Sequence, residues 1–324
     1  MLRLSLERSR GQHAVDNGPV EALSARFDAV EKVLRSNEKL LQSHEQALHA
    51  QNAPMVRPAC YVGDNRILTM TNRGDRMYLD SRDIAITPGI LCYGGWEDGT
   101  TALLDRFLKP GMVWADIGAN CGYFTVIGHR LVRAGGADGR TVAFEISPDN
   151  FRLCVDNLAL TWMSEGSRVE RMAVYSEERD ALSFQLFRKY GTNSGLCGIS
   201  NEYADYIGER PETVSVPAIT LDDYFADRQP PDFIKIDIEG GEWHALEGGR
   251  RMIAAQPDLR ILIEWSPAQL KSCGTDLRAL AELFPALGFK CFNTENAMTP
   301  LEVADCLAID RTTMFLLSRT DPSA

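Results

Sequence analysis

The stretch VWADIGANCGYFTVIG, residues 113–128, places an acid and glycines where an apolar run ends. Asp116 closes the run, and Gly118 and Gly122 follow it with no lysine nearby. Glycines let a backbone turn tightly and approach a ligand closely. A P-loop needs the pattern GK[ST] and a dinucleotide turn needs GxGxxG, whereas this chain reads GANCG. The stretch therefore predicts a turn that binds a ligand through groups other than phosphates.

A second acid, Glu145, ends the next apolar run, AFEIS, where a carboxylate can accept hydrogen bonds from a ribose diol. With Asp116 and the glycine turn, it indicates a nucleoside that carries an amino acid, namely S-adenosylmethionine. The ammonium group suits Asp116 or a carbonyl of the turn, and the carboxylate suits the N–H groups of a helix that begins near Tyr123. Alone, Asp116 is interpreted as a helix N-cap and Glu145 as an exposed charge. Their joint occurrence favours the ligand.

A third acidic group lies in KIDIEGGEWH, residues 235–244. Methyl transfer from this cofactor requires close alignment of donor and acceptor and, if the acceptor is an alcohol, the removal of a proton. Asp237, Glu239 and His244 are the candidate bases, and Asp237 is the best placed because it ends the predicted strand. Lys235 is expected to pair with Asp237 or Glu239. The alternative is a structural ion-pair cluster without a catalytic role.

The same acids admit a metal-dependent alternative. Asp237 and Glu264 end adjacent predicted strands, and together they could bind Mg²⁺ and lower the pKa of a coordinated hydroxyl. No third carboxylate or asparagine is evident beside Glu264, because Trp265, Ser266 and Pro267 follow it. A site without a metal is therefore the favoured interpretation.

The acceptor is expected to bind at KYGTNSGLCGISNEYADYIG, residues 189–208, which reads as a mobile lid or substrate loop. Tyr190, Asn193 and Ser194 are the predicted substrate residues because their side chains suit hydrogen bonding to a sugar.

These residues must be positioned by an alternation of strands and helices. Strands are predicted at RILTMTN, RMYLD and DIAITPG, then at MVWADIG, TVAFEIS, RVERMAVYS, FIKIDIEG and LRILIEWSP. Helices are predicted at 122–134, 148–162, 241–255 and 275–287, and FKCFNT and TMFLLSR close the chain as two strands without a helix between them. This alternation predicts an α/β fold with a parallel sheet covered on both faces and an antiparallel edge.

The N-terminal region has a different pattern. Residues 1–20 are polar and are predicted to be disordered, and residues 21–52 are predicted to form a coiled-coil helix. Leu23, Phe27, Val30 and Leu34 begin a seam of alternating four- and three-residue steps. We expect this helix to join copies of the chain into a homo-oligomer. The alternative is that it docks on the globular part of its own chain.

The composition narrows the partners and the location. The chain has 324 residues and a net charge of -11, which argues against a nucleic-acid partner. No apolar run reaches the ~20 residues of a membrane span, and the opening segment does not resemble a signal peptide. A cytoplasmic location is therefore expected. The eight cysteines form no CxxC pair and are expected to be mostly reduced, buried thiols.

Four segments, DIGANCGYFT, AFEISPDNFRLCVDNLAL, TLDDYF and FIKIDIEGGEWHALEGG, resemble the FkbM-type methyltransferase family. A further segment, GGWEDGTTALLDRFLKPG, is similar to the one that precedes the first motif of that family. The resemblance spans roughly residues 80–319. The chain departs from the family at Ile146, Ser147 and Pro148, where members usually read FEPxP, and at Cys121, where they more often have an apolar residue.

The resemblance implies a Rossmann-like class I fold with a seven-stranded, mostly parallel sheet and an antiparallel last strand. It implies a methyltransferase domain at 111–319, preceded by a strand and loop segment at 55–110. It also implies S-adenosylmethionine as cofactor and methyl transfer to a hydroxyl, with a sugar or glycoconjugate as the expected acceptor. By position, the cofactor residues it implies are Glu97, Asp116, Gly118, Asn120, Gly122, Tyr123, Phe124, Thr125, Glu145 and Asp237.

Other functions remain open at this point. The acceptor could instead be a polyketide, a peptide or another small natural product. In a different class, the chain could be an inactive coiled-coil adaptor that retains a methyltransferase fold. The absence of the middle glycine from the turn places an NAD-dependent oxidoreductase last.

Overall fold

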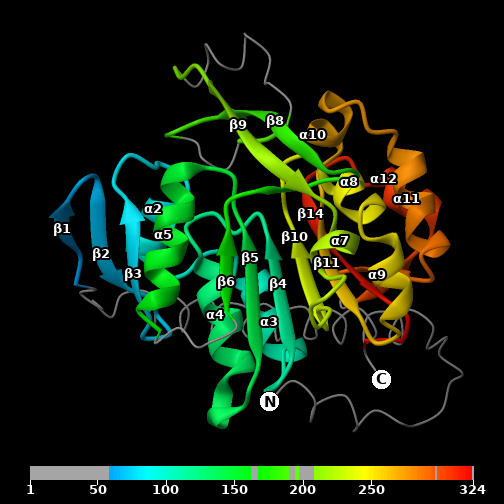
Figure 1. Cartoon of the computed structure of the whole chain (residues 1–324), viewed down its shortest axis with the longest axis horizontal. Coiled ribbons are helices and arrows are strands. Elements are labelled where there is room, and N and C mark those ends of the chain that lie inside the picture. Colours follow the sequence, from blue (N-terminus) through cyan, green and yellow to red (C-terminus); the bar gives the residue numbers. More distant parts are fainter. Residues whose placement is uncertain (1–57, 162–166, 190–193, 197–207, 296–297, 323–324) are drawn as a thin grey trace, which may run out of the picture. The chain divides into compact units, whose positions relative to one another are not determined.

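The apolar segments that flank the acidic motifs form one eight-stranded sheet (Figure 1). The structure, a computed structural model, describes residues 58–161, 167–189, 194–196, 208–295 and 298–322. The strands of the sheet are β4 (Val113–Ile117), β5 (Arg140–Phe144), β6 (Arg168–Glu170), β10 (Phe233–Ile236), β11 (Arg260–Trp265), β12 (Lys290–Asn293), β13 (Thr299–Leu301) and β14 (Thr313–Ser318).

The strand order is β13-β12-β14-β11-β10-β4-β5-β6. Strands β4, β5, β6, β10 and β11 pair in parallel, and β14 pairs antiparallel with both β11 and β12. The predicted mostly parallel sheet with an antiparallel last strand is confirmed, and the short hairpin strand β13 adds to it at one edge. From β4 the chain winds outward through β5 and β6, then crosses to β10 on the other side of β4. Ligands of such sheets bind at this switch point, beyond the carboxyl ends of the strands.

Helices cover both faces because the central strands are buried on both faces, with all five residues of β4 and all four of β10 buried. One face packs on α2 (Ile86–Tyr93), α3 (Asp98–Phe107), α4 (Tyr123–Val132) and α5 (Pro148–Ala159), and a 3₁₀ turn, η2 (Ala134–Gly136), follows α4. The other face packs on α7 (Leu221–Tyr224), α8 (Glu242–Glu247), α9 (Arg250–Ala255), α10 (Pro267–Ser272), α11 (Leu277–Ala286) and α12 (Val303–Ala308). The resulting three layers are those of a doubly wound α/β fold.

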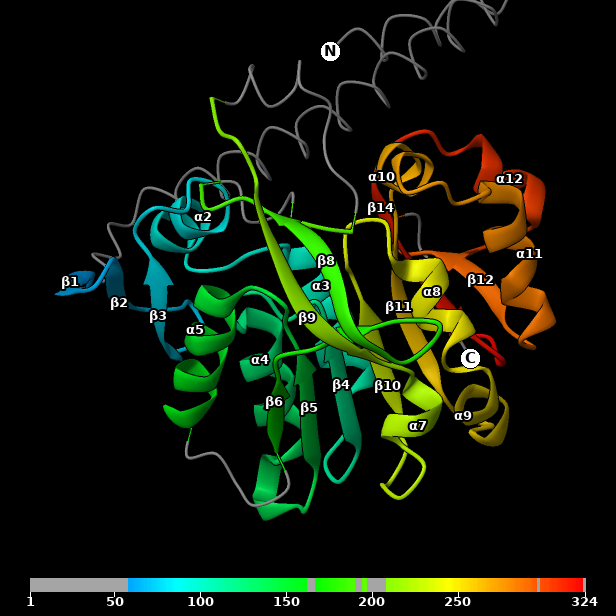
Figure 2. The same ribbon diagram turned by 45° about the horizontal axis from the view of Figure 1, so that its top comes forward.

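Two small sheets flank the main one (Figure 2). Strands β7 (Ala173–Val174), β9 (Glu212–Ile219) and β8 (Arg179–Leu186) form a sheet in that order, inserted between β6 and β10. Strands β1 (Cys60–Gly63), β2 (Arg66–Met70) and β3 (Arg76–Asp80) form an antiparallel meander. The meander is fixed to α5 by Asn157, which exchanges two hydrogen bonds with the backbone of Tyr78.

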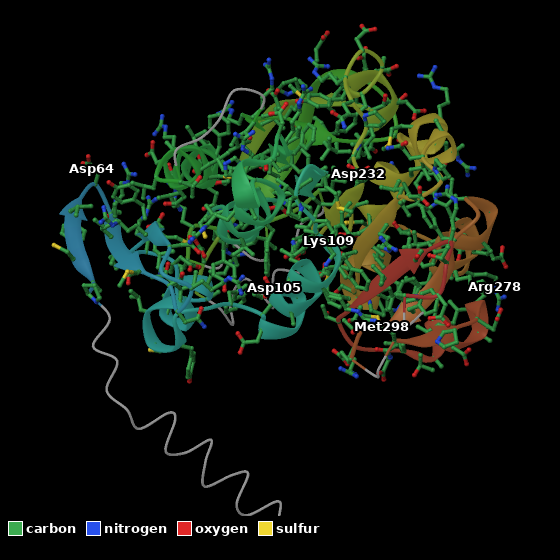
Figure 3. All side chains as sticks on the ribbon, turned by 90° about the horizontal axis from the view of Figure 1, so that it is seen from below. Asp64, Asp105, Lys109, Asp232, Arg278 and Met298 are labelled. Carbon is green, nitrogen blue, oxygen red and sulfur yellow. The ribbon has the colours of Figure 1, made fainter. Side chains whose placement is uncertain are left out.

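The amino-terminal edge of the main sheet is closed by a side chain. Asp232, labelled in Figure 3, accepts a hydrogen bond from the N–H of Val113 at 2.8 Å. This contact joins the starts of β10 and β4. Ligands of such sheets lie at the opposite edge, beyond the carboxyl ends of the strands.

The prediction of a strand at DIAITPG is wrong, because this segment leads into helix α2. Ile86 and Ile90 lie four residues apart and are both buried, as on one face of a helix. Pro88 is tolerated in the first turn because the N–H groups there have no partner within the helix, and Asp83 accepts the N–H of Thr87 at 2.6 Å.

Two further predictions of elements are corrected. The helix predicted at 241–255 is divided into α8 and α9 at Gly248, where a Cβ atom would lie 2.0 Å from the carbonyl oxygen of Tyr175. The two closing strands are separated by β13 and α12, although no helix was expected there.

The predicted coiled-coil helix at 21–52 lies outside the described residues, and residues Arg57–Ala324 form one compact unit. Across the described part of the chain, no helix is long and apolar enough to cross a membrane. Cys121, Cys154 and Cys291 are buried free thiols, as expected. Cys273 is disulfide-bonded, so the expectation of reduced thiols is wrong at this position.

Candidate active site

A cavity of about 330 Å³ lies at the carboxyl ends of β4, β5, β10 and β11. Residues of the inserted sheet, among them Ala173 and Phe184, also line it. The predicted site residues that line this cavity are Glu97, Gly118, Asn120, Tyr123, Phe124, Glu145, Ser194, Lys235, Asp237, Glu239 and Glu264. Residues that lie more than 160 positions apart in the sequence thus meet at one place, and its size suits a small organic ligand.

Gly118 brings the turn after β4 against the end of β10. Its φ is +88°, and a Cβ atom there would lie 1.8 Å from the carbonyl oxygen of Asp237. Gly122 begins α4 at φ +87° and lies against α5, where a Cβ atom would be 3.0 Å from the Cα atom of Cys154. Gly118 therefore shapes the cavity itself, whereas Gly122 allows close packing of two helices and does not line the cavity.

Asp116 lies beneath this turn rather than in the cavity. Its side chain is fully buried, and Oδ2 accepts a hydrogen bond from Oγ1 of Thr125 at 2.6 Å. Burial raises the pKa of Asp116, although nearby Lys235 opposes this shift. Neither Asp116 nor Thr125 lines the cavity, so the predicted direct contact of Asp116 with an ammonium group is not supported. The pair instead holds the first turn of α4 in place.

Glu145 links the glycine turn to the start of α5. Its Oε2 accepts the N–H of Asn120 and its Oε1 accepts the N–H of Ser147, both at 2.7 Å. The residue is 7% exposed, and burial raises its pKa to about 7. The alternative of an exposed charge at a strand end is therefore wrong. Each carboxylate oxygen has a second lone pair, so Glu145 can still accept hydrogen bonds from a ligand in the cavity.

Lys235 is a buried cation among carboxylates. Its Nζ donates to Oδ2 of Asp237 at 2.8 Å and lies 5.1 Å from the ring centre of Phe124. Lys235 is also the register partner of Asp116 on β4. Burial alone would lower the pKa of Lys235, but the charges of Asp237, Asp116 and Glu97 outweigh burial and raise it. The predicted pairing of Lys235 with Asp237 is thus present in the structure.

Asp237, Glu239 and Glu264 form what we call the acidic corner. One carboxylate oxygen of each residue lies within 4.8 Å of one oxygen of each of the other two. The parallel register of Lys235 with Leu262 and of Ile236 with Ile263 explains why Asp237 meets Glu264. Glu239 is a third carboxylate beside Glu264, where none was expected. It was missed because it follows β10 rather than β11, although the spacing of two residues from Asp237 was a usable signal.

Burial is the main cause of raised pKa values in this part of the cavity. It raises the pKa of Glu239 and of Glu264, and the neighbouring carboxylates raise both further. Glu242 closes the turn after β10 by accepting the N–H groups of Ile238 and Gly240, and burial raises its pKa to about 7.

Three residues other than glycine that line the cavity have backbones in the left-handed region that favours glycine. The φ angles are +45° at Glu97, +51° at Asn120 and +57° at Glu239. Oε2 of Glu97 accepts a hydrogen bond from Oγ1 of Thr100 at 3.0 Å, and burial together with Asp237 raises its pKa. Such strained positions gather at functional sites. Gln269, in the first turn of α10, was not predicted, yet it lines the cavity and donates to Oε2 of Glu239.

His244 lies apart from these residues. Its ring stacks on Tyr175 with 4.0 Å between ring centres, and Nδ1 is hydrogen-bonded to Oγ of Ser176 at 2.9 Å. Since His244 does not line the cavity, its prediction as a base is not supported. Ser194 lines the cavity, and its Oγ accepts the N–H of Phe187 at 2.9 Å. The other two predicted substrate residues, Tyr190 and Asn193, lie outside the described residues.

Residues 116–291, more than half of the chain, match the family described as the methyltransferase FkbM domain. No curated protein gives a significant match.

Among solved structures, a methyltransferase FkbM from Methylobacillus flagellatus KT has 17% identity and a TM-score of 0.40, over 64% of this chain and 43% of its own. The match therefore spans less than half of that protein. A TehB-like SAM-dependent methyltransferase from Corynebacterium glutamicum has 10% identity and a TM-score of 0.40, over 72% and 95% of the two chains. The P. horikoshii protein TYW2, in complex with MeSAdo, has 11% identity and a TM-score of 0.37, over 80% and 74%.

Proposed function

The chain belongs to the FkbM methyltransferase family, and from this premise we propose that it transfers a methyl group from S-adenosylmethionine to a hydroxyl oxygen of a sugar or glycoconjugate. One observation carries the proposal. The cavity at the switch point joins a buried carboxylate at the end of β5, Glu145, to the acidic corner at the ends of β10 and β11. The first suits a nucleoside and the second suits an acceptor that must lose a proton.

Glu145 would hold the cofactor by accepting hydrogen bonds from its ribose hydroxyls. Asn120 and Tyr123, which line the same part of the cavity, would contact the rest of the nucleoside. Asp116 and Thr125 would act indirectly, by fixing the start of α4. When bound, the cofactor supplies a sulfonium-activated methyl group. Among the described residues that line the cavity, Lys235 is the only lysine or arginine. Such a lining suits a ligand without phosphates.

The acidic corner would hold the acceptor hydroxyl and take its proton. Asp237 is fixed by Lys235, and Glu239 is fixed by Gln269, so both carboxylates have defined positions at the cavity wall. A positioned carboxylate can accept the proton while the oxygen attacks the methyl carbon. Ser194 would contribute a hydroxyl to the acceptor side. Polar and carboxylate groups on that side favour a hydroxylated acceptor such as a sugar.

The proposal extends to the domain boundaries. We propose that residues 111–319 are the methyltransferase domain, that residues 55–110 are its N-terminal segment, and that residues 21–52 join copies of the chain. Deleting residues 1–52 should lower the number of chains per particle that light scattering measures. An unchanged number of chains per particle would instead favour docking of that helix on its own chain.

Calorimetry with S-adenosylhomocysteine and with NAD tests the cofactor. We expect saturable heat from the first and none from the second, and the reverse result would overturn the assignment. Incubation of the full chain with methyl-labelled S-adenosylmethionine and a panel of glycans, polyketides and peptides tests the acceptor. Label in a glycan hydroxyl supports the proposal, whereas label confined to nitrogen or to a polyketide would contradict it.

A further inference from the structure

The acidic corner has the ligand spacing of a cation site. Asp237 and Glu239 follow β10, Glu264 lies near the end of the adjacent strand β11, and one oxygen of each lies within 4.8 Å of the others. Oxygens bound to one Mg²⁺ at about 2.1 Å are about 3 Å apart when adjacent and about 4.2 Å apart when opposite, and Ca²⁺ spreads them further. Three carboxylates at this spacing can therefore share one ion with little movement.

A second observation, separate from the spacing of the carboxylates, points to a missing partner. Glu264 is 9% exposed and lines the cavity, yet its Oε2 has no hydrogen-bond partner among the described residues. Oε1 of Gln269, which also lines the cavity, is likewise buried without a partner in the described part of the chain. A buried polar atom left unpaired destabilises a protein by about 1–3 kcal/mol. Both atoms are oxygens, the element that hard cations prefer.

The charges near the corner are also unbalanced. Lys235 donates to Asp237 alone, and Gln269 gives Glu239 a neutral donor, so Glu264 receives no cation from the described residues. Glu97 adds another carboxylate to the lining. Like charges in a buried site repel one another strongly, and a bound cation would remove that repulsion.

We propose that Asp237, Glu239 and Glu264 bind one divalent cation of the Mg²⁺ or Mn²⁺ type, with the amide oxygen of Gln269 as a further ligand. Asp237 can do so through Oδ1 while Oδ2 remains paired with Lys235. This arrangement gives a partner to Oε2 of Glu264 and to Oε1 of Gln269, which have none among the described residues. It leaves the nucleoside side of the cavity, at Glu145, unaffected.

The role of the ion rests on the proposed function. An acceptor hydroxyl bound to the cation would have a lowered pKa. Its O–H bond breaks and the proton passes to a carboxylate of the corner or to water. The oxygen then forms a bond to the methyl carbon, and the electrons of the carbon–sulfur bond return to sulfur, which leaves S-adenosylhomocysteine.

Mn²⁺ titration of the full chain, followed by electron paramagnetic resonance, tests the binding itself. One saturable site is expected, and Glu264→Gln should weaken Mn²⁺ binding on the order of tenfold or more because one charged ligand is lost. Glu145→Gln is the matched control from the same cavity. It should retain Mn²⁺ affinity within about twofold while losing affinity for S-adenosylhomocysteine, and Glu264→Gln should show the opposite pattern.

Thermal unfolding keeps the test independent of activity. Mn²⁺ should raise the Tm of the wild type and of Glu145→Gln, but not that of Glu264→Gln or of a second variant, Glu239→Gln. Absence of a saturable Mn²⁺ site in the wild type, or an unchanged Mn²⁺ affinity in folded Glu264→Gln, would overturn the proposal. Mn²⁺ binding without binding of S-adenosylhomocysteine would instead overturn the proposed function and leave the cation site standing.

Discussion

Replacing Gly118 with alanine should separate the two reasons for a glycine in the turn after β4. Gly118 and Gly111 share the same φ of +88°, but their surroundings differ. A Cβ atom at Gly118 would lie 1.8 Å from the carbonyl oxygen of Asp237, whereas one at Gly111 has no atom within 4 Å. Gly111→Ala is therefore a matched control that carries the backbone strain without the collision.

The magnitudes follow from these two environments. A left-handed conformation costs a residue other than glycine about 1–2 kcal/mol, and both variants should lose this much stability. Real Cβ atoms do not come within 3.0 Å of such an oxygen, so at Gly118 the turn or the end of β10 must also move. Forced displacement in a packed region costs about 1–3 kcal/mol more. Gly118→Ala should thus be less stable than Gly111→Ala by about 1–3 kcal/mol.

Urea unfolding measures this difference, and calorimetry with S-adenosylhomocysteine measures its consequence for the site. Movement of the Asp237 backbone should weaken ligand binding in Gly118→Ala, while Gly111→Ala should bind like the wild type. Equal losses of stability in the two variants would refute the reasoning, because the close approach of β4 and β10 would then add nothing to the cost of the alanine at Gly118.

Four further predictions concern Glu145, Asp237 and His244. Burial raises the pKa of Glu145 to about 7, and ribose hydroxyls favour its charged form. S-adenosylhomocysteine should therefore bind about tenfold more tightly at pH 8 than at pH 6. Calorimetry at both pH values measures this ratio, and Glu145→Gln should abolish the pH dependence. Without ligand, the native protein holds this proton between pH 4.5 and 7 while the unfolded chain releases it, so the contribution of Glu145 to stability should fall as pH rises through that range. Asp237→Asn should lower methyl transfer by about 100-fold or more with ligand affinity within a few-fold, as measured with labelled cofactor; an unaltered rate would remove Asp237 from the mechanism. His244→Ala should lose about 1 kcal/mol of stability in urea unfolding, through its hydrogen bond to Ser176, but keep the rate; a large loss of rate would show that His244 acts in the reaction.

The order of the elements around the site was predictable because the strands of the main sheet carry strong apolar patterns. All five residues of β4 are buried, as are all four of β10, so both read clearly as central strands. Helix α2 was misassigned because ITPG resembles a strand that ends in a turn. Only its tertiary packing on β3 and α4, with Ile86 and Ile90 buried, favours the helix.

Side-chain positions were predictable only where register or sequence proximity fixes them. Lys235 and Asp237 lie two residues apart on one strand, so their pairing could be inferred. The meeting of Glu239 with Glu264 depends on the register of β10 with β11 and on a left-handed residue in the turn, and neither leaves a local pattern. Asp116 was expected to contact the ligand because a strand end usually faces it, but its side chain is fully buried outside the cavity lining and is hydrogen-bonded to Thr125.

The strained backbone and the crowded charges of the site have a common structural cause. Glu97, Asn120 and Glu239 each adopt a left-handed conformation, which costs a residue such as glutamate about 1–2 kcal/mol and asparagine less, and a glycine at any of them would remove this cost. A glycine, however, could not supply a carboxylate at Glu97 or Glu239, or the amide oxygen of Asn120 that accepts the N–H of Cys121. Asn120 and Glu239 follow closely on the ends of β4 and β10, and Glu97 lies directly before α3, so the left-handed turns bring side chains from separate elements to the lining of one cavity. The surrounding sheet, buried on both faces, supplies the stability that such an arrangement requires. The strain is therefore best explained by the ligand that the side chains are arranged to meet, because the fold alone would be more stable without it.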